Sequence, residues 1–274
     1  MNLKEILINF QINFAAFDLD GTLLNENGEV FDNIMKGLTL LKNQNIEMFI
    51  VTGRTVSSLI DSNIPKEFLE LFNENIICND GIILYNNKTK LIKTYSSIQS
   101  TIITKLIEYI GNKNDYALEI DGKIFSPNKR SALKYSMVYK INRGSIIISD
   151  PKSSLQEENI TKFVIFPKQD EIKKILGFLK KNECNVKKIK FLDALEVTPK
   201  ETCKATGLLN YLRENRKMRN LNKVISFGDG TNDCTLLKKC IFGISVIGSH
   251  PDAVKNSDMH LTQSLGEYLV QSLH

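Results

Sequence analysis

Two pairs of aspartates stand where apolar runs of the chain give way to turn residues. Asp18 and Asp20 follow the run INFAAF, and Asp229 and Asp233 follow KVISF. Taken singly, each pair also fits an ordinary turn, because Asp-Gly is a common turn pair and Gly-Asp-Gly-Thr-Asn can cap a helix. If Asp18, Asp20 and Asp229 converge, charges about 4 Å apart repel by roughly 4 kcal/mol per pair at an effective dielectric of about 20. A cation is then expected among them, and carboxylate oxygens favour Mg²⁺ over zinc or copper.

Groups suited to hold a phosphoryl group accompany these aspartates. Thr52 offers a hydroxyl, and Gly53 lets backbone N–H groups come close to an anion. A lysine would add a positive charge. The segment 198–201 (TPKE) has the pattern of a capping box with proline at the first helical position, so Lys200 and Lys204 are expected on one helix face. The spacing does not choose between the two lysines, and a solvated surface position is the ordinary alternative for each.

The elements around these residues are predicted to alternate between strand and helix. Apolar runs at 12–17 and 46–51 flank a helical pattern, which gives a βαβ unit, and the alternation returns after about residue 195 with a strand at 223–227. Ligands of open α/β sheets bind at the carboxyl ends of the strands. Each motif falls at such an end, so residues distant in the sequence are expected to converge there.

The middle of the chain differs from the rest in its sequence pattern, because strand-like runs outnumber helical patterns there. Helical periodicity is seen at 102–110 and 172–179. The strand-like runs are 116–120, 145–149, 162–166 and 186–191. This shift predicts an α+β domain at 84–190, inserted into an α/β domain formed by 1–83 and 191–274.

Composition narrows the class of partner. Lysine and arginine number 36 against 31 aspartates and glutamates, an excess spread along the chain, which argues against nucleic-acid binding and suits an anionic substrate. The five cysteines include no CxxC pair, and the three histidines have no ligand-like spacing, so we expect free thiols and neither a zinc site nor a Ser-His-Asp triad. No apolar run approaches the roughly 20 residues of a membrane span. We therefore expect a soluble, cytoplasmic protein without membrane or nucleic-acid partners.

The motifs in series resemble the haloacid dehalogenase-like (HAD) superfamily, in particular its Cof-type sugar-phosphate phosphatases. They are DLDGT at 18–22, TGR at 52–54, a lysine followed by a helix, and GDGTND at 228–233. DLDGT alone is moderately specific, whereas the series is highly specific. The resemblance implies a Rossmann-like parallel-sheet core with an inserted α+β cap of the C2 type between the second and third motifs, which is the interval that contains 84–190.

The resemblance also implies roles for the aspartates. Asp18 would be the nucleophile that forms an aspartyl-phosphate, and Asp20 would protonate the leaving alkoxide and then deprotonate water. Asp18, Asp20 and Asp229 would hold Mg²⁺, with Asp20 using its backbone carbonyl. Asp233 would orient the surroundings of the metal through water.

The remaining motif residues would serve the phosphate. Thr52, Gly53 and Asn232 would hold its oxygens. Lys204 matches the family lysine better than its neighbour four residues earlier, because it directly precedes an Ala/Gly-containing helical run. Arg54 would point toward the substrate or the cap.

These roles predict a Mg²⁺-dependent phosphatase of small phosphorylated metabolites, with sugar phosphates as the expected class. Asp20 favours a phosphatase or phosphomutase, because the dehalogenases of the family lack an acid there. A phosphohexomutase, which needs the same two aspartates, is the nearest alternative. A non-catalytic binding protein on the same fold is a further alternative, but its expected signature is a lost nucleophile or metal ligand, and this chain keeps all of them.

Overall fold

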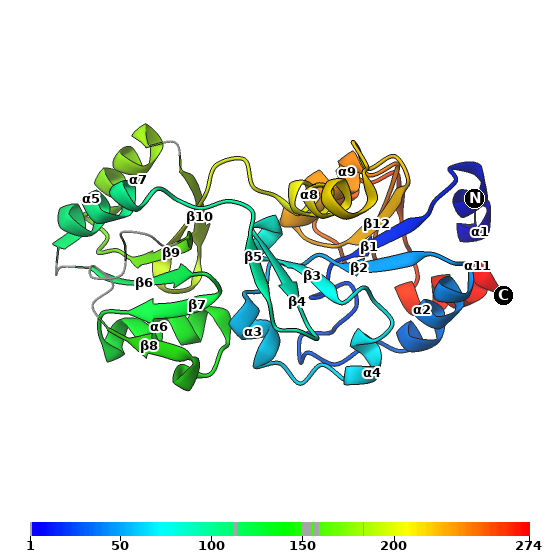
Figure 1. Cartoon of the computed structure of the whole chain (residues 1–274), viewed down its shortest axis with the longest axis horizontal. Helices are drawn as coiled ribbons and strands as arrows, with labels where there is room; N and C mark the ends of the chain where they lie inside the picture. The colour runs from blue at the N-terminus through cyan, green and yellow to red at the C-terminus, as the bar shows by residue number, and fades with distance from the viewer. Residues whose placement is uncertain (1, 112–113, 150–154, 156–158, 183) are drawn as a thin grey trace. The chain divides into compact units, whose positions relative to one another are not determined.

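The chain forms two compact units (Figure 1). The computed structural model describes residues 2–111, 114–149, 155, 159–182 and 184–274. The core unit comprises Met1–Gly53, Ser62–Leu91 and Cys203–His274, and the inserted unit comprises Arg54–Asp61 and Ile92–Thr202.

A parallel sheet of five strands forms the centre of the core unit, in the order β14-β13-β12-β1-β2. Its strands are β1 (Phe14–Phe17), β2 (Glu47–Ile50), β12 (Val224–Gly228), β13 (Phe242–Ser245) and β14 (Met259–His260). In the register, Phe17 of β1 lies opposite both Ile50 and Phe227. Because a parallel sheet is covered on both faces, its strands are short continuous apolar runs rather than alternating ones.

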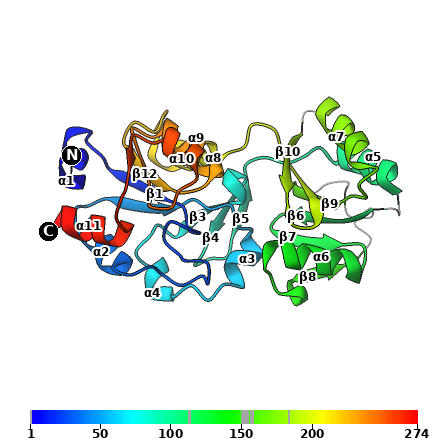
Figure 2. The same ribbon diagram turned by 180° about the vertical axis from the view of Figure 1, so that it is seen from behind.

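Helices cover the two faces of this sheet, with α8 and α9 on one and α2 and α11 on the other (Figures 1 and 2). On one face, Ala205, Leu208 and Leu212 of α8 pack with Phe49 of the sheet, and their helical spacing explains why they share a face. The helices of the unit are α1 (Leu3–Asn9), α2 (Ile34–Asn43), α4 (Lys66–Leu69), α8 (Lys204–Arg216), α9 (Cys234–Lys239), α10 (Pro251–Lys255) and α11 (Leu265–Leu273), with the short 3-10 turn η6 (Thr231–Asp233).

A hairpin extends the core unit beside β2. Strand β3 (Asn75–Cys78) pairs antiparallel with β4 (Ile83–Asn86), and the 3-10 turn η1 (Asn79–Gly81) joins them. Ile77 of β3 forms a parallel bridge with Val51, directly after β2. The end of β3 therefore lies beside the end of β2.

The inserted unit contains a six-stranded sheet in the order β10-β11-β9-β6-β7-β8, antiparallel except for the pair β7–β8. Leu118 packs with helices α5 and α7, whereas Ala117 packs with α6, so helices lie on opposite faces of the sheet. The elements are α3 (Val56–Ile60), β5 (Ile92–Thr94), α5 (Ser100–Ile110), β6 (Asp115–Ile120), β7 (Lys123–Ser126), α6 (Lys129–Tyr139), η3 (Arg143–Ser145), β8 (Ile146–Ile148), β9 (Ile160–Phe166), α7 (Ile172–Lys181), β10 (Asn185–Ile189), η5 (Phe191–Asp193) and β11 (Ala194–Thr198).

The predicted fold class is confirmed, since a parallel α/β core accompanies an α+β unit. The compact units divide later in the chain than the predicted boundaries at 83/84 and 190/191. One reason is that β4 pairs with β3 of the core unit, and another is that β11 pairs with β9 and β10 of the inserted unit. The assignment of the units as core and cap domains stays a prediction. None of the described helices has the length and apolarity needed to cross a membrane.

The predicted capping box at 198–201 is wrong. Thr198 is the last residue of β11, where it pairs with Asn185, and Glu201 has a left-handed φ of 63°, which a helix excludes. The helix instead begins at Lys204, and the Cys203 N–H donates to the Thr206 hydroxyl at 3.0 Å. The two candidate lysines therefore do not share a helix.

Candidate functional site

The ends of three neighbouring strands of the core unit carry the motif residues. Asp18 directly follows β1, and its N–H donates to the carbonyl of Phe227 at 3.0 Å. Asp229 directly follows β12, and Thr52 lies beyond β2 with its N–H bonded to the Ile77 carbonyl at 2.8 Å. Because these strands are parallel neighbours, their carboxyl ends lie at one edge of the sheet, as the sequence predicts.

A fully buried lysine joins two of the aspartates. Lys204, the first residue of α8, is 0 % exposed, and its Nζ lies 2.5 Å from Asp18 Oδ1 and 2.7 Å from Asp233 Oδ1. Burial by itself lowers the pKa of Lys204, but Asp18 and Asp233 outweigh burial and hold this pKa above its usual range. Lys204 is therefore a cation within the site, whereas Lys200 is an exposed residue of the inserted unit.

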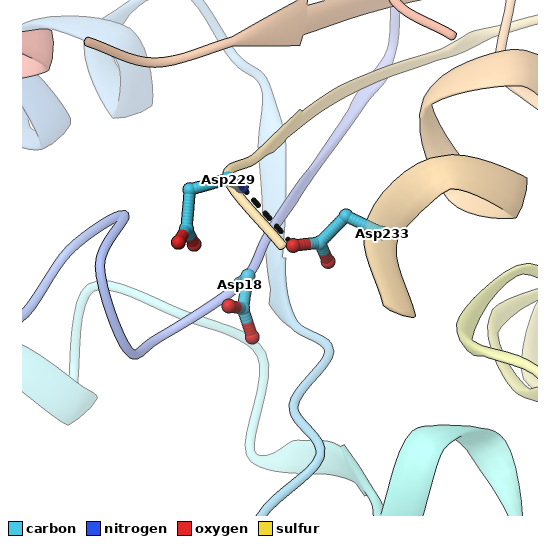
Figure 3. Close-up of side chains that lie close together, drawn as sticks. All are labelled: Asp18, Asp229 and Asp233. Atoms are coloured by element: carbon cyan, nitrogen blue, oxygen red, sulfur yellow. Dashed lines mark hydrogen bonds between the residues drawn. The ribbon is translucent and has the colours of Figure 1, made fainter. Parts of the chain in front are cut away.

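Three carboxylates lie close together at this site (Figure 3). Asp18, Asp229 and Asp233 each offer an oxygen, and these oxygens lie within 4.8 Å of one another. Asp233 Oδ2 accepts hydrogen bonds from the backbone N–H groups of Asp229 and Gly230 at 3.1 and 2.9 Å, while its Oδ1 contacts the lysine. The hydrogen bonds of Asp233 thus tie the end of β12 to the start of α8.

The cluster carries more negative than positive charge. Burial raises the pKa of Asp18 well above its ordinary value; Asp233 and Asp229 raise it too, and Lys204 opposes them. Burial and Asp233 also raise the pKa of Asp229, against a hydrogen bond from the Thr22 hydroxyl. Three carboxylates face one ammonium, so a divalent cation would balance the charge. The all-oxygen donors suit a hard cation, so the residues present fit such an ion.

Asp20 contributes differently from the other aspartates. Its side chain is exposed and is not a member of the three-carboxylate cluster. The family resemblance predicts that Asp20 binds the metal through its backbone carbonyl and transfers protons through its carboxyl group. Arg54 belongs to the inserted unit, and its role stays a prediction.

The predicted phosphate-binding residues lie close together in the core unit. Thr52 is buried, and a Cβ placed on Gly53 would lie 3.2 Å from Asn232 Nδ2 and 3.0 Å from Asp80 Oδ1. Asn232, on η6, donates from Nδ2 to Asp80 Oδ1 at 2.9 Å. The Lys204 ammonium, which contacts Asp18 and Asp233, also lies near these residues.

A contact between backbones sets the position of α8. A Cβ on Gly207 would meet Gly81 O at 2.7 Å and Ile77 Cγ2 at 2.8 Å, and a Cβ on Gly81 would collide with the carbonyl of Cys203. Gly81 also has a φ of 99°, which favours glycine. The start of α8, and Lys204 with it, therefore lies directly against η1.

Sequence reasoning gave no role to two residues of this region. Thr22, the last residue of DLDGT, is buried and donates its hydroxyl to Asp229 Oδ1 at 3.0 Å. Asp80 lies in the segment Asn-Asp-Gly between β3 and β4, which belongs to none of the motifs singled out from the sequence. The available signal was its position shortly after the apolar end of β3, since Asp18 and Asp229 also lie just after apolar runs.

Comparisons with known proteins give the family. A model described as haloacid dehalogenase-like hydrolase matches residues 15–265. The 5-amino-6-(5-phospho-D-ribitylamino)uracil phosphatase YitU of Bacillus subtilis is 23 % identical over 250 residues, which cover 88 % of each chain. The crystal structure of TM0651 from Thermotoga maritima shares the fold with a TM-score of 0.77 and 22 % identity, covering 95 % of this chain and 97 % of that one. The HAD subclass IIB sugar phosphatase BT4131 shares the fold with a TM-score of 0.69 and 18 % identity, covering 94 % and 98 %.

The chain belongs to the haloacid dehalogenase-like hydrolases. The family match confirms the resemblance drawn from the motifs, and the relatives bear out the prediction of a phosphatase-type hydrolase of the Cof type. The structural likeness confirms an α/β core fold with a second, added domain.

Proposed function

We propose that the protein is a Mg²⁺-dependent phosphatase that hydrolyses small phosphorylated metabolites, sugar phosphates in particular, through an aspartyl-phosphate at Asp18. The observation that carries this proposal is the buried ion pair of Asp18 with Lys204 inside a cluster of excess negative charge. The family supports it, as do a relative named for a phosphorylated ribitylamino substrate and a neighbour named a sugar phosphatase.

In the first step, a carboxylate oxygen of Asp18 forms a bond to phosphorus while the bond from phosphorus to the leaving oxygen breaks. The electron pair leaves with that oxygen, and the carboxyl group of Asp20 donates a proton to it. The exposed side chain of Asp20 supports this role, because a proton donor must reach the leaving group.

In the second step, a water oxygen bonds to phosphorus as the bond from Asp18 to phosphorus breaks. Asp20, now a carboxylate, accepts the proton of that water. Inorganic phosphate is released, and both aspartates return to their starting states. Alternation of acid and base duties requires one carboxyl group near both oxygens, which the exposed side chain of a single residue near the nucleophile in the chain can satisfy.

The cations and donors of the site hold the phosphoryl oxygens during both steps. Lys204 supplies a fixed positive charge, and Thr52 and Asn232 supply a hydroxyl and an amide N–H. Asp18, Asp229 and the carbonyl of Asp20 would hold Mg²⁺, which would supply the positive charge that the carboxylate cluster lacks. Asp233 keeps Lys204 and the loop that carries Asp229 in place.

The inserted unit, residues 84–190 in the sequence prediction, is proposed to act as a cap that selects the leaving group. A cap that closes over a site excludes bulk water and disfavours polymeric substrates. Small phosphorylated metabolites, rather than nucleic acid or phosphoprotein, are therefore the proposed substrates.

Phosphate release tests the proposal. Wild type, Asp18→Asn and the matched control Asp258→Asn, which lies in the same unit outside the cluster, are assayed on sugar, nucleotide and aryl phosphates with Mg²⁺ or excess chelator. We expect Mg²⁺-dependent release, at least about a thousandfold loss in Asp18→Asn, and a control within about twofold of wild type. Robust turnover in chelator, or a nearly active Asp18→Asn, would contradict the proposal. Isomerisation of a sugar phosphate with little phosphate release would show a mutase instead.

A further inference from the structure

Asp80 touches the predicted phosphate-binding set although it belongs to none of the four motifs. Its backbone N–H donates to the Thr52 carbonyl at 3.1 Å, and its Oδ1 accepts the Asn232 amide at 2.9 Å. That same oxygen would lie 3.0 Å from a Cβ on Gly53. Asp80 is therefore bonded to two of these residues and packed against a third.

Lys204 completes this set. The negative charge of Asp80 acts on Lys204 together with those of Asp18 and Asp233. Asp80 is not one of the three clustered carboxylates, so its influence on the site comes through the phosphate-binding residues and not through the metal ligands.

The backbone around Asp80 has a costly conformation. Asn79 and Asp80 are consecutive left-handed residues, with φ of 51° and 50°. The amide of Asn79 is 2 % exposed, and neither of its polar atoms has a hydrogen-bond partner within the described part of the chain. Such features cluster where a site constrains the chain. Asparagine and aspartate tolerate this region better than other side chains, so Asp80 can occupy it and still offer a carboxylate.

The hydrogen bond between Asp80 and Asn232 determines which end of the Asn232 amide faces Asp80. A carboxylate only accepts hydrogen bonds, so it selects the NH₂ end of the Asn232 amide and not the carbonyl end. That NH₂ group has a second N–H, which can donate to a phosphate oxygen. If the amide turned over, its carbonyl would face an oxygen that also only accepts.

We propose that Asp80 is a positioning residue that fixes the Asn232 amide with its NH₂ group toward the substrate phosphate. The proposal rests on the proposed function, since it takes Asn232 as a phosphate ligand. It adds a residue of the connection between β3 and β4 to a site otherwise built on the ends of the parallel strands, on η6 and on the start of α8.

Two substitutions separate the hydrogen bond from the backbone. Asp80→Gly removes the acceptor and suits a φ of 50°, so the fold is retained; Asp80→Asn keeps an acceptor in the same conformation. We expect Asp80→Gly to lower kcat/KM about tenfold and to weaken binding of inorganic phosphate, measured by calorimetry with Mg²⁺, by a similar factor. Asp80→Asn should stay within about threefold of wild type. Asn45→Gly, at another left-handed residue, is the control for the backbone change and should match wild type.

A double-mutant cycle shows whether Asp80 acts through Asn232. In an Asn232→Ala background, Asp80→Gly should change kcat/KM and phosphate affinity by less than about twofold. A full tenfold effect in that background, or an Asp80→Gly enzyme equal to wild type, would overturn the positioning role alone. A wild-type protein that neither binds nor releases phosphate would overturn the proposed function and this inference with it.

Discussion

Two buried aspartates, one in each unit, have nearly the same exposure and opposite electrostatics. Asp18 of the core unit is 5 % exposed and Asp115 of the inserted unit is 4 % exposed, and each pairs with a lysine. Burial tends to raise the pKa of Asp115, but Lys134 and Arg130 outweigh it and lower that pKa. The pKa of Asp18 is raised, because burial dominates and its lysine is shared with Asp233.

The difference separates a structural ion pair from a reactive one. Asp115 has two cations and the Ser131 hydroxyl to itself, so its charge is fully compensated within the chain. Asp18 lies among like charges with a single ammonium, so its compensation is incomplete without another cation. Excess charge of one sign in a buried cluster is costly unless a ligand restores the balance.

Loss of the shared lysine should produce the largest change. Lys204→Met leaves buried carboxylates without their cation, and we expect a loss of about 3–5 kcal/mol in the free energy of unfolding. Lys134→Met should cost about 1 kcal/mol or less, because Arg130 and Ser131 still hold Asp115. Urea unfolding without added divalent cation measures both. Equal losses would show that the two sites are electrostatically alike.

Mg²⁺ should stabilise only the unbalanced site. At about a hundredfold above its dissociation constant, Mg²⁺ should raise the free energy of unfolding by about 2.7 kcal/mol. Asp229→Asn should remove most of this gain, whereas Asp115→Asn should keep it. Thermal unfolding across a Mg²⁺ titration provides the measurement, and an equal gain in Asp229→Asn would place the ion elsewhere.

The ion pairs of Asp115 should make the free energy of unfolding depend on pH. The pKa of Asp115 is lower in the folded chain than in the unfolded one, so its contribution is complete above an unfolded pKa of about 3.9 and disappears as pH falls through the folded pKa. Asp115→Asn should therefore cost about 1–2 kcal/mol at pH 7 and progressively less below pH about 4. Denaturant unfolding across this range tests the sign; a difference that grows on acidification would refute it.

The smallest effect should come from the Thr22 hydroxyl. Thr22→Val removes a hydrogen bond to Asp229 and should reduce the Mg²⁺-dependent stabilisation by about 1 kcal/mol. Thr161→Val is the matched control, because it removes a buried hydroxyl bonded to the Glu119 carbonyl in the inserted unit. We expect the control to lose basal stability and to keep its full response to Mg²⁺. The same response in both variants would argue against a role for Thr22 at Asp229.

The core strands and most of the site could be predicted because both depend on local signals. Asp18 and Asp229 follow apolar runs, and parallel pairing carries such positions to one edge of a sheet. Lys204 could be chosen only through the family resemblance. The local pattern at 198–201 pointed to a helix start that pairing within β11 prevents.

The elements that escaped prediction are those whose burial depends on distant partners. Helix α6 buries Ser131, Ala132, Tyr135 and Ser136, so its inner face lacks the apolar periodicity that marks a helix. Asp80 resembles a turn residue until Asn232, far away in the sequence, comes beside it. Tertiary contacts decide both cases, and a single sequence does not encode them locally.

Gly81 and Gly207 lie so close together that neither position has room for a side chain, and this close approach fixes where Lys204 lies. A methyl group at position 207 would overlap Gly81, so α8 and the lysine at its start would have to shift although no charged residue has been changed. Side chains of increasing size at position 207 would then change, step by step, how strongly the Lys204 ammonium interacts with Asp18 and Asp233. The contact between Gly81 and Gly207 therefore offers a way to adjust the electrostatics of the site while every charged residue is kept.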